Sequence, residues 1–173
     1  MADASFQREF LETHNKYRAM HGAPPLTLSS DLNDSAQKWA DHLLALGLMS
    51  HSDTKNGENI YSKLSSDTLT GKEAVDSWYS EVTNYKWSSP GFGSQTGHFT
   101  QVVWKDSTKL GVGLASAGSR AYVVAQYWPA GNMNMPGYFE KNVLQKGSGE
   151  GRGEGSSSSG GSDKSKGEKC TLL

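Results

Sequence analysis

The apolar residues in the first half of the chain are spaced as in amphipathic helices. Helical stripes cover residues 5–22 and 29–47, and a third begins at Thr70. Gly47 suits the C-terminal cap of the second stripe, and Thr70 with Glu73 fits a capping box at the start of the third. The stripes comprise Phe6, Phe10, Leu11, Tyr17, Leu32, Ala36, Trp39, Ala40, Leu43, Leu44, Val75, Trp78, Tyr79 and Val82. We therefore expect three helices that each bury one face.

The apolar pattern changes in the second half of the chain. Residues 110–128 resemble two strands around Gly118-Ser119, a pair suited to a type II′ hairpin turn. Residues 98–104 form a shorter β-like run before them. Helices around a mostly antiparallel sheet predict an α+β layered domain.

Composition divides the chain into a body and a tail. Residues 147–169 contain 8 Gly, 7 Ser and 8 charged residues and nothing else. Such a segment has no apolar surface to offset the entropy lost on ordering, so we expect disorder. As a flexible coil it would span roughly 25 Å. The prediction is a folded domain over 1–146 and a flexible tether over 147–173.

Charge and cysteine content exclude several classes of protein. A formal net charge of −1 argues against a nucleic-acid-binding protein, which usually carries a basic excess. The N-terminus lacks the apolar core of a signal peptide, and nowhere do about 18 consecutive apolar residues occur, as a membrane span needs. A single cysteine, Cys170, allows no internal disulfide, which fits a reducing compartment.

The familiar catalytic motifs are absent, including the nucleophile elbow, the Walker A loop and the H-E-x-x-H helix. The candidates that remain are His51, Glu58, Glu81 and His98. Together they could hold a divalent ion or perform acid–base chemistry. Each could equally be a hydrogen-bonding or solvated residue. Spacing alone leaves both interpretations open, because 47 residues separate the two histidines.

Four segments, in order, resemble the CAP superfamily of cysteine-rich secretory, antigen 5 and pathogenesis-related proteins. They are "HSDTKNGENI" (51–60), "AVDSWYSEVTNY" (74–85), "GHFTQVVWKDSTKLGVG" (97–113) and "YVVAQYWPAGNM" (122–133). The match covers about residues 6–144 and is most similar to the Golgi-associated plant pathogenesis-related type, a cysteine-poor intracellular branch.

The resemblance implies an α-β-α sandwich with a shallow cleft in which His51, Glu58, Glu81 and His98 converge. In members of that family the two histidines can bind a divalent ion such as zinc, and relatives bind sterols, fatty acids or acidic phospholipids. Two imidazoles under-ligate zinc, so weak, exchangeable binding is expected. Ala125 replaces a usual cysteine of the second signature, and a cysteine-rich extension is missing. Both departures argue against the secreted form.

The residues Cys170-Thr171-Leu172-Leu173 fit the C-a-a-X prenylation pattern, and a final Leu favours geranylgeranyl. The alternative is a cysteine placed there by chance. Stable anchoring generally takes two signals. Lys164, Lys166 and Lys169 could supply the second, although Asp163 and Glu168 reduce the net charge of 163–169 to +1.

Three hypotheses follow. The first is a non-enzymatic CAP domain tethered to the cytosolic face of a membrane, such as the Golgi, where it binds lipid or protein and self-associates as a homodimer. The second is a metal-assisted or serine-type hydrolase that uses Glu58 or Glu81 as the base. The third is a defence-type protein secreted without a signal peptide.

Overall fold

A four-stranded sheet lies at the centre of the computed structural model, which describes residues 2–65 and 67–147. The strand order is β1-β3-β4-β2, with β1 parallel to β3 and the other pairs antiparallel. The strands are β1 (Thr27–Leu28), β2 (Gly57–Leu64), β3 (Lys109–Ala117) and β4 (Arg120–Trp128). The expected mostly antiparallel sheet is confirmed, and β2 is one of its edges.

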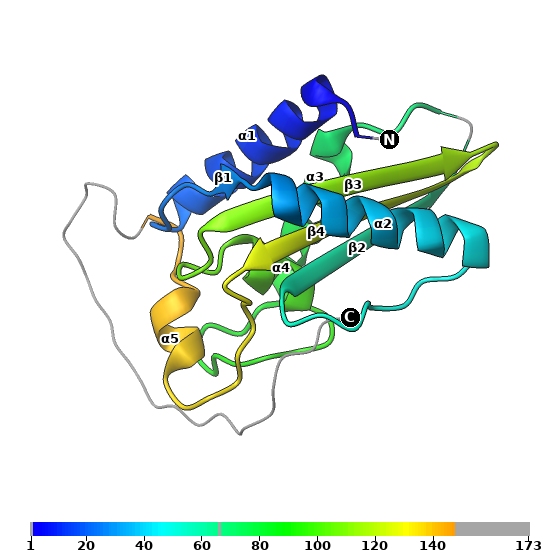
Figure 1. Cartoon of the computed structure of the whole chain (residues 1–173). Coiled ribbons are helices and arrows are strands. Elements are labelled where there is room, and N and C mark those ends of the chain that lie inside the picture. The colour runs from blue at the N-terminus through cyan, green and yellow to red at the C-terminus, as the bar shows by residue number, and fades with distance from the viewer. Residues whose placement is uncertain (1, 66, 148–173) are drawn as a thin grey trace.

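Helices cover both faces of the sheet (Figure 1). Helix α2 packs on β3 and β4, whereas α1, α3 and α4 form the opposite layer. The helices are α1 (Ala4–Met20), α2 (Ser30–Leu46), α3 (Gly71–Tyr79), the 3-10 helix η1 (Ser80–Asn84), α4 (Gly97–Val102) and α5 (Tyr138–Asn142). The predicted α+β class and three-layer α-β-α sandwich are therefore confirmed.

The helix boundaries follow from local capping. Ser29 accepts a hydrogen bond from the Leu32 amide at the start of α2, and Gly47 ends that helix with φ of 76°. Thr70 and Glu73 form both halves of the predicted capping box of α3. Each cap satisfies a backbone group that the helix itself leaves unpaired, so these ends could be predicted from sequence.

Strand β4 sends alternate side chains to the two layers, as the pleat requires. Tyr122 and Val124 pack beneath α2, and Val123, Ala125 and Tyr127 pack beneath α1, α3 and α4. Ala125 is thus a fully buried core residue.

Close packing of α2 on the sheet requires glycine in β3. A Cβ at Gly111 or Gly113 would clash with the backbone of α2 at Leu32 and Gln37. These two positions set how near the helix lies to the sheet.

One predicted element is wrong. The β-like run at 98–104 is mostly helix α4. Phe99, Thr100, Gln101 and Val102 are all buried, so no polar helical face shows in the sequence. A carboxylate from another element caps the helix, which local pattern cannot reveal.

Strand β2 was not predicted from the sequence, because its first residues, Gly-Glu-Asn, lack the β-branched side chains typical of strands.

The hairpin prediction is supported. Within the pair Gly118-Ser119 the positive φ, 62°, falls on the glycine, as in a type II′ turn.

Within the described ranges, every helix is too short or too polar to cross a bilayer. Of the predicted tether, the structure describes only Gly147, whose amide donates to Met20 O at 2.8 Å. The predicted disorder of the tail, its lysines and the lipidation of Cys170 lie outside the described residues.

Candidate functional site

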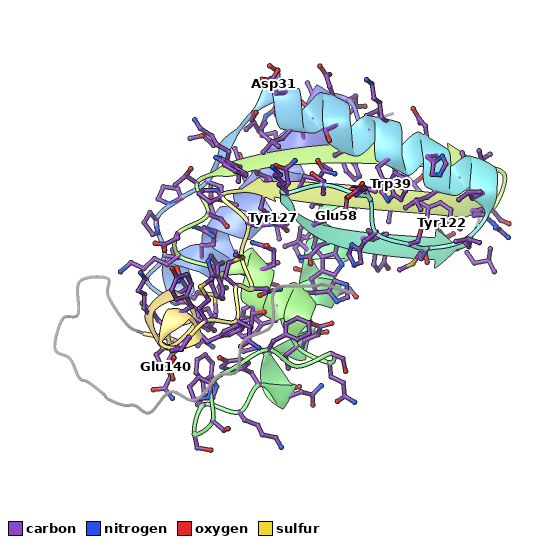
Figure 2. The ribbon with its side chains drawn as sticks, turned by 60° about the horizontal axis from the view of Figure 1, so that its bottom comes forward. Asp31, Trp39, Glu58, Tyr122, Tyr127 and Glu140 are labelled. Atoms are coloured by element: carbon purple, nitrogen blue, oxygen red, sulfur yellow. The ribbon has the colours of Figure 1, made fainter. Side chains whose placement is uncertain are left out.

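The first imidazole–carboxylate pair joins the loop after α2 to Glu58 at the start of β2, which Figure 2 labels. His51 Nδ1 lies 2.8 Å from Glu58 Oε1. The Ser52 amide also donates to Oε1 at 2.9 Å, and Ser52 Oγ donates to Oε2 at 2.6 Å. The Gln126 amide group completes the set at 2.8 Å from Oε2. Glu58 is thus a buried carboxylate that accepts four hydrogen bonds.

These contacts keep Glu58 ionised. Burial alone would raise the pKa of Glu58, but the hydrogen bonds from His51, Ser52 and Gln126 together lower it below its ordinary value. Because the carboxylate accepts, His51 Nδ1 is the donor, and in the neutral ring Nε2 carries the free lone pair. A carboxylate with four donors is a poor general base.

A second layer of hydrogen bonds holds the Gln126 amide in place. Its Oε1 accepts from Ser35 Oγ of α2 at 2.6 Å and from Asn56 Nδ2 at 3.1 Å. These two donors fix which end of the amide faces Glu58. Gln126 lies opposite Glu58 in the β2–β4 register, so the sheet itself aligns them.

The second pair joins η1 to the start of α4. His98 Nδ1 lies 2.8 Å from Glu81 Oε2. Glu81 Oε1 accepts from the amides of His98 at 2.9 Å and Phe99 at 3.0 Å. Glu81 therefore caps α4 and orients the ring of His98, the second residue of that helix. The N-terminus of a helix is a favourable place for the negative charge of Glu81.

The His98 ring lies parallel to the indole of Trp78, with centroids 6.1 Å apart and planes 7° apart. Its Nε2 is buried and has no hydrogen-bond partner in the part of the chain that the structure describes. In the neutral ring, the Nδ1 proton is donated to Glu81 and Nε2 carries an unshared lone pair. A buried acceptor without a partner is unusual in a folded protein and favours an external ligand.

Asn59 links the two pairs. It follows Glu58 in β2, and its side-chain amide donates to His98 O at 3.1 Å and to Tyr127 Oη at 3.3 Å. Consecutive strand residues face opposite sides of the sheet. Glu58 and Asn59 therefore face opposite sides of β2: Glu58 bonds to the ring of His51, and Asn59 bonds to the backbone of His98.

The donors suit a loosely held metal ion. Metal-ligating histidines usually donate their second ring nitrogen to a carboxylate, as His51 and His98 both do. Across residues 2–65 and 67–147, no cluster of three or more His, Cys, Asp or Glu could hold a metal ion. Each pair thus presents one Nε2 atom, and water would have to complete the coordination of an ion bound there.

The geometry gives little support to a serine nucleophile. In the described ranges no Ser, Thr or Cys side chain hydrogen-bonds to an imidazole; Ser52 Oγ bonds to Glu58 instead.

The structure adds three residues to the site that could not be predicted from the sequence, Ser52, Asn59 and Gln126. Ser52 and Asn59 lie next to His51 and Glu58 in the chain, whereas only the β2–β4 register reveals Gln126.

Two other histidines belong to the core. His14 bonds through Nδ1 to Phe10 O and through Nε2 to Tyr127 Oη, and burial lowers its pKa to about 3. His21 likewise bonds to Leu144 O and Tyr79 Oη, and burial lowers its pKa as well. Both are neutral, fully satisfied residues on the buried side of α1.

Comparison with known proteins agrees with this architecture. The family model described as "CAP: Cysteine-rich secretory protein family" matches residues 11–128. The human Golgi-associated plant pathogenesis-related protein 1 is 47% identical over 83% of this chain and 95% of its own. Protein PRY2 of Saccharomyces cerevisiae is 41% identical over 80% of this chain, which spans only 41% of that relative.

A solved structure has the same fold. The crystal structure of NaASP2 with Zn²⁺ superimposes with a TM-score of 0.68 at 25% identity, covering 84% of this chain and 88% of that one. The residues that the family model matches include His51, Glu58, Glu81 and His98. The chain therefore belongs to the CAP, or cysteine-rich secretory protein, family.

Proposed function

We propose that this protein is a non-enzymatic CAP-domain module that binds lipid or protein at a membrane and carries a weak divalent-cation site at His51 and His98. One observation carries the proposal: both carboxylates of the site are hydrogen-bonded to imidazole Nδ1 atoms. Glu58 and Glu81 thereby orient the rings, which leaves neither as a free base.

The chemistry of the donors supports zinc as the cation. Two neutral imidazoles with carboxylate-bonded Nδ1 atoms are typical zinc ligands. The relative NaASP2 has a crystal structure with Zn²⁺. A bound divalent ion would supply a positive charge and exchangeable water positions beside β2. Two protein ligands are fewer than tight structural zinc sites use, so the expected binding is weak.

The membrane part of the proposal places the protein on the cytosolic face of Golgi membranes. The name of the human relative associates that protein with the Golgi. Prenylation of Cys170 remains a prediction from the residues Cys170 to Leu173. Acidic phospholipid or sterol is the proposed lipid ligand, and a homodimer is the proposed assembly.

Zinc titration of the full chain by calorimetry tests the cation site. We expect the double variant His51→Ala, His98→Ala to lose at least about 100-fold in zinc affinity, because both protein ligands are removed. His42→Ala is the matched control, since His42 is exposed on α2 and stacks on Trp39. Equal affinity in the double variant and the control would refute the site.

Turnover assays on broad peptide and ester panels test the non-enzymatic part. We expect no hydrolysis above that of the double histidine variant. Turnover that disappears in the double variant would instead support the hydrolase.

Intact-mass spectrometry of protein from its native cells tests the anchor. The prediction is a geranylgeranyl group on Cys170 with the last three residues removed. Flotation with liposomes, with and without the last four residues, then separates binding by the anchor from binding by the domain. An unmodified Cys170 with Leu173 still present would refute the anchor and leave the cation site untouched.

A further inference from the structure

Large aliphatic side chains are exposed at the end of the molecule where α2 terminates. The exposed fractions are 49% for Leu46, 52% for Leu48, 46% for Met49 and 73% for Leu64. Three of these residues surround the Gly47 cap, and Leu64 is the last residue of β2. Exposed aliphatic residues that gather in one place mark contact surfaces.

Arg120 brings the two segments together. It is the cross-strand partner of Leu64, and its Nη1 donates to Gly47 O at 3.2 Å. The Arg120 side chain therefore passes between Leu64 and the end of α2. Figure 1 shows that end of α2 beside the β3–β4 hairpin, at one extremity of the molecule. We call Leu46, Leu48, Met49, Leu64 and Arg120 the distal tip.

The distal tip carries an available positive charge. Arg120 forms none of the salt bridges found among the described residues, and its single hydrogen bond there uses Nη1. Asp67, three positions after Leu64 in the sequence, forms none of the salt bridges found among the described residues, with Arg120 or any other partner. A guanidinium among aliphatic side chains complements a phosphate above an apolar layer.

The size of the distal tip argues against a protein partner as its main occupant. At these exposed fractions the four side chains offer about 300 Å² of apolar surface. A stable protein interface buries about 800 Å² on each side. Shallow insertion at a membrane surface needs far less area when a lipid anchor already holds the protein nearby.

We infer that the distal tip is a membrane-contact site: its aliphatic side chains enter an anionic bilayer while Arg120 pairs with a lipid phosphate. The inference rests on the membrane attachment proposed above and supplies the second contact that a single lipid chain requires.

The tether is long enough for this contact. Cys170 lies 23 residues after Gly147, which allows a reach of about 80 Å when extended. The domain is about 40 Å across. An anchor that starts at the far end of the domain, where Gly147 bonds to Met20, can therefore reach the membrane under the distal tip.

Hydrogen exchange on vesicles tests the inference directly. The sole cysteine, Cys170, allows the full chain to be coupled to a maleimide lipid in vesicles of phosphatidylcholine with phosphatidylserine. We expect about tenfold slower exchange in peptides covering 44–50 and 62–65 than in the uncoupled protein. Vesicles of phosphatidylcholine alone should slow the exchange less, because the positively charged choline group shields the lipid phosphate from Arg120.

Variants give the matched control. Leu48→Gln with Leu64→Gln should abolish the slowing, and Arg120→Gln should remove the preference for phosphatidylserine. Met135→Gln should change neither, because Met135 is equally exposed, at 46%, but lies outside the distal tip. Thermal unfolding of each variant checks that it folds.

Three outcomes would overturn the inference: no slowing at the distal tip, slowing that survives in the double glutamine variant, or equal loss in Met135→Gln. Slowing without vesicles that grows with protein concentration would identify a second copy as the occupant and overturn it too. Chemical coupling replaces the cellular anchor, so failure here is distinguishable from an unmodified Cys170 or an absent cation site.

Discussion

The two imidazole–carboxylate pairs share one contact but differ in how they are held. Each has Nδ1 to carboxylate oxygen at 2.8 Å. The Glu58 side chain is 2% exposed and bonds to side chains of Ser52 and Gln126, whereas Glu81 is 21% exposed and bonds mostly to amides of α4. Glu58 is part of the sheet, and Glu81 is the cap of a short helix.

This difference separates two roles of a carboxylate. Both orient an imidazole so that Nε2 is presented as a lone pair. Only Glu58 also occupies a buried position where four donors need an acceptor, so its loss would leave those donors unpaired. Substitution at the two glutamates should therefore affect cation binding alike and stability unequally.

The largest expected effect is on stability. Glu58→Gln should lower the free energy of unfolding by about 3 kcal/mol, because a buried charged acceptor with several donors is lost. Glu81→Gln should cost about 1 kcal/mol, as for a helix cap. Urea denaturation at pH 7 measures both. Equal losses, or a larger loss for Glu81→Gln, would show that the two carboxylates are held alike.

The next effect is on zinc affinity. Each glutamate variant should bind zinc about 10–100-fold more weakly, as for other carboxylates that orient a metal-ligating histidine. Calorimetry at a temperature where both variants are folded gives the comparison. Unchanged affinity in Glu81→Gln would mean that His98 needs no orienting partner.

A smaller effect is expected from Ser52→Ala. Loss of the hydroxyl that donates to Glu58 Oε2 at 2.6 Å should cost about 1.5 kcal/mol, since the acceptor is charged. Ser80→Ala is a control that also removes a serine hydroxyl bond, but one to a backbone carbonyl at an exposed site. Urea midpoints that shift equally in both variants would contradict the special place of Glu58.

The smallest effect is the pH dependence. The folded pKa of Glu58 lies below its unfolded value, so its contribution to stability is present above about pH 4.3 and is lost as pH falls through the folded pKa. The stability difference between the wild type and Glu58→Gln should therefore shrink as pH falls from about 5 to about 3. A difference that stays constant over that range would contradict the lowered pKa.

Local signals account for the parts of the fold that sequence could predict. The caps at Ser29, Gly47 and Thr70 and the turn at Gly118 are local, and they locate α2, α3 and the β3–β4 hairpin. Helix α4 was mistaken for a strand because its cap, Glu81, comes from another element. Strand β2 could not be predicted because its first residues, which include Glu58 and Asn59 of the site, are polar.

The four candidate site residues came from spacing and resemblance, but their pairing did not. Nothing in the sequence assigns His51 to Glu58 and His98 to Glu81, because the second pair depends on how η1 meets α4. Nor does sequence separate these histidines from His14 and His21, which tertiary hydrogen bonds satisfy fully.

Nuclear magnetic resonance of the full chain with ¹⁵N-labelled histidine tests most directly whether the carboxylates orient His51 and His98 for a cation. At neutral pH we expect both rings to carry the proton on Nδ1, and we expect zinc to shift their Nε2 resonances while those of His14, His21 and His42 stay unchanged. A proton on Nε2 of either ring, or zinc shifts confined to other histidines, would contradict the account.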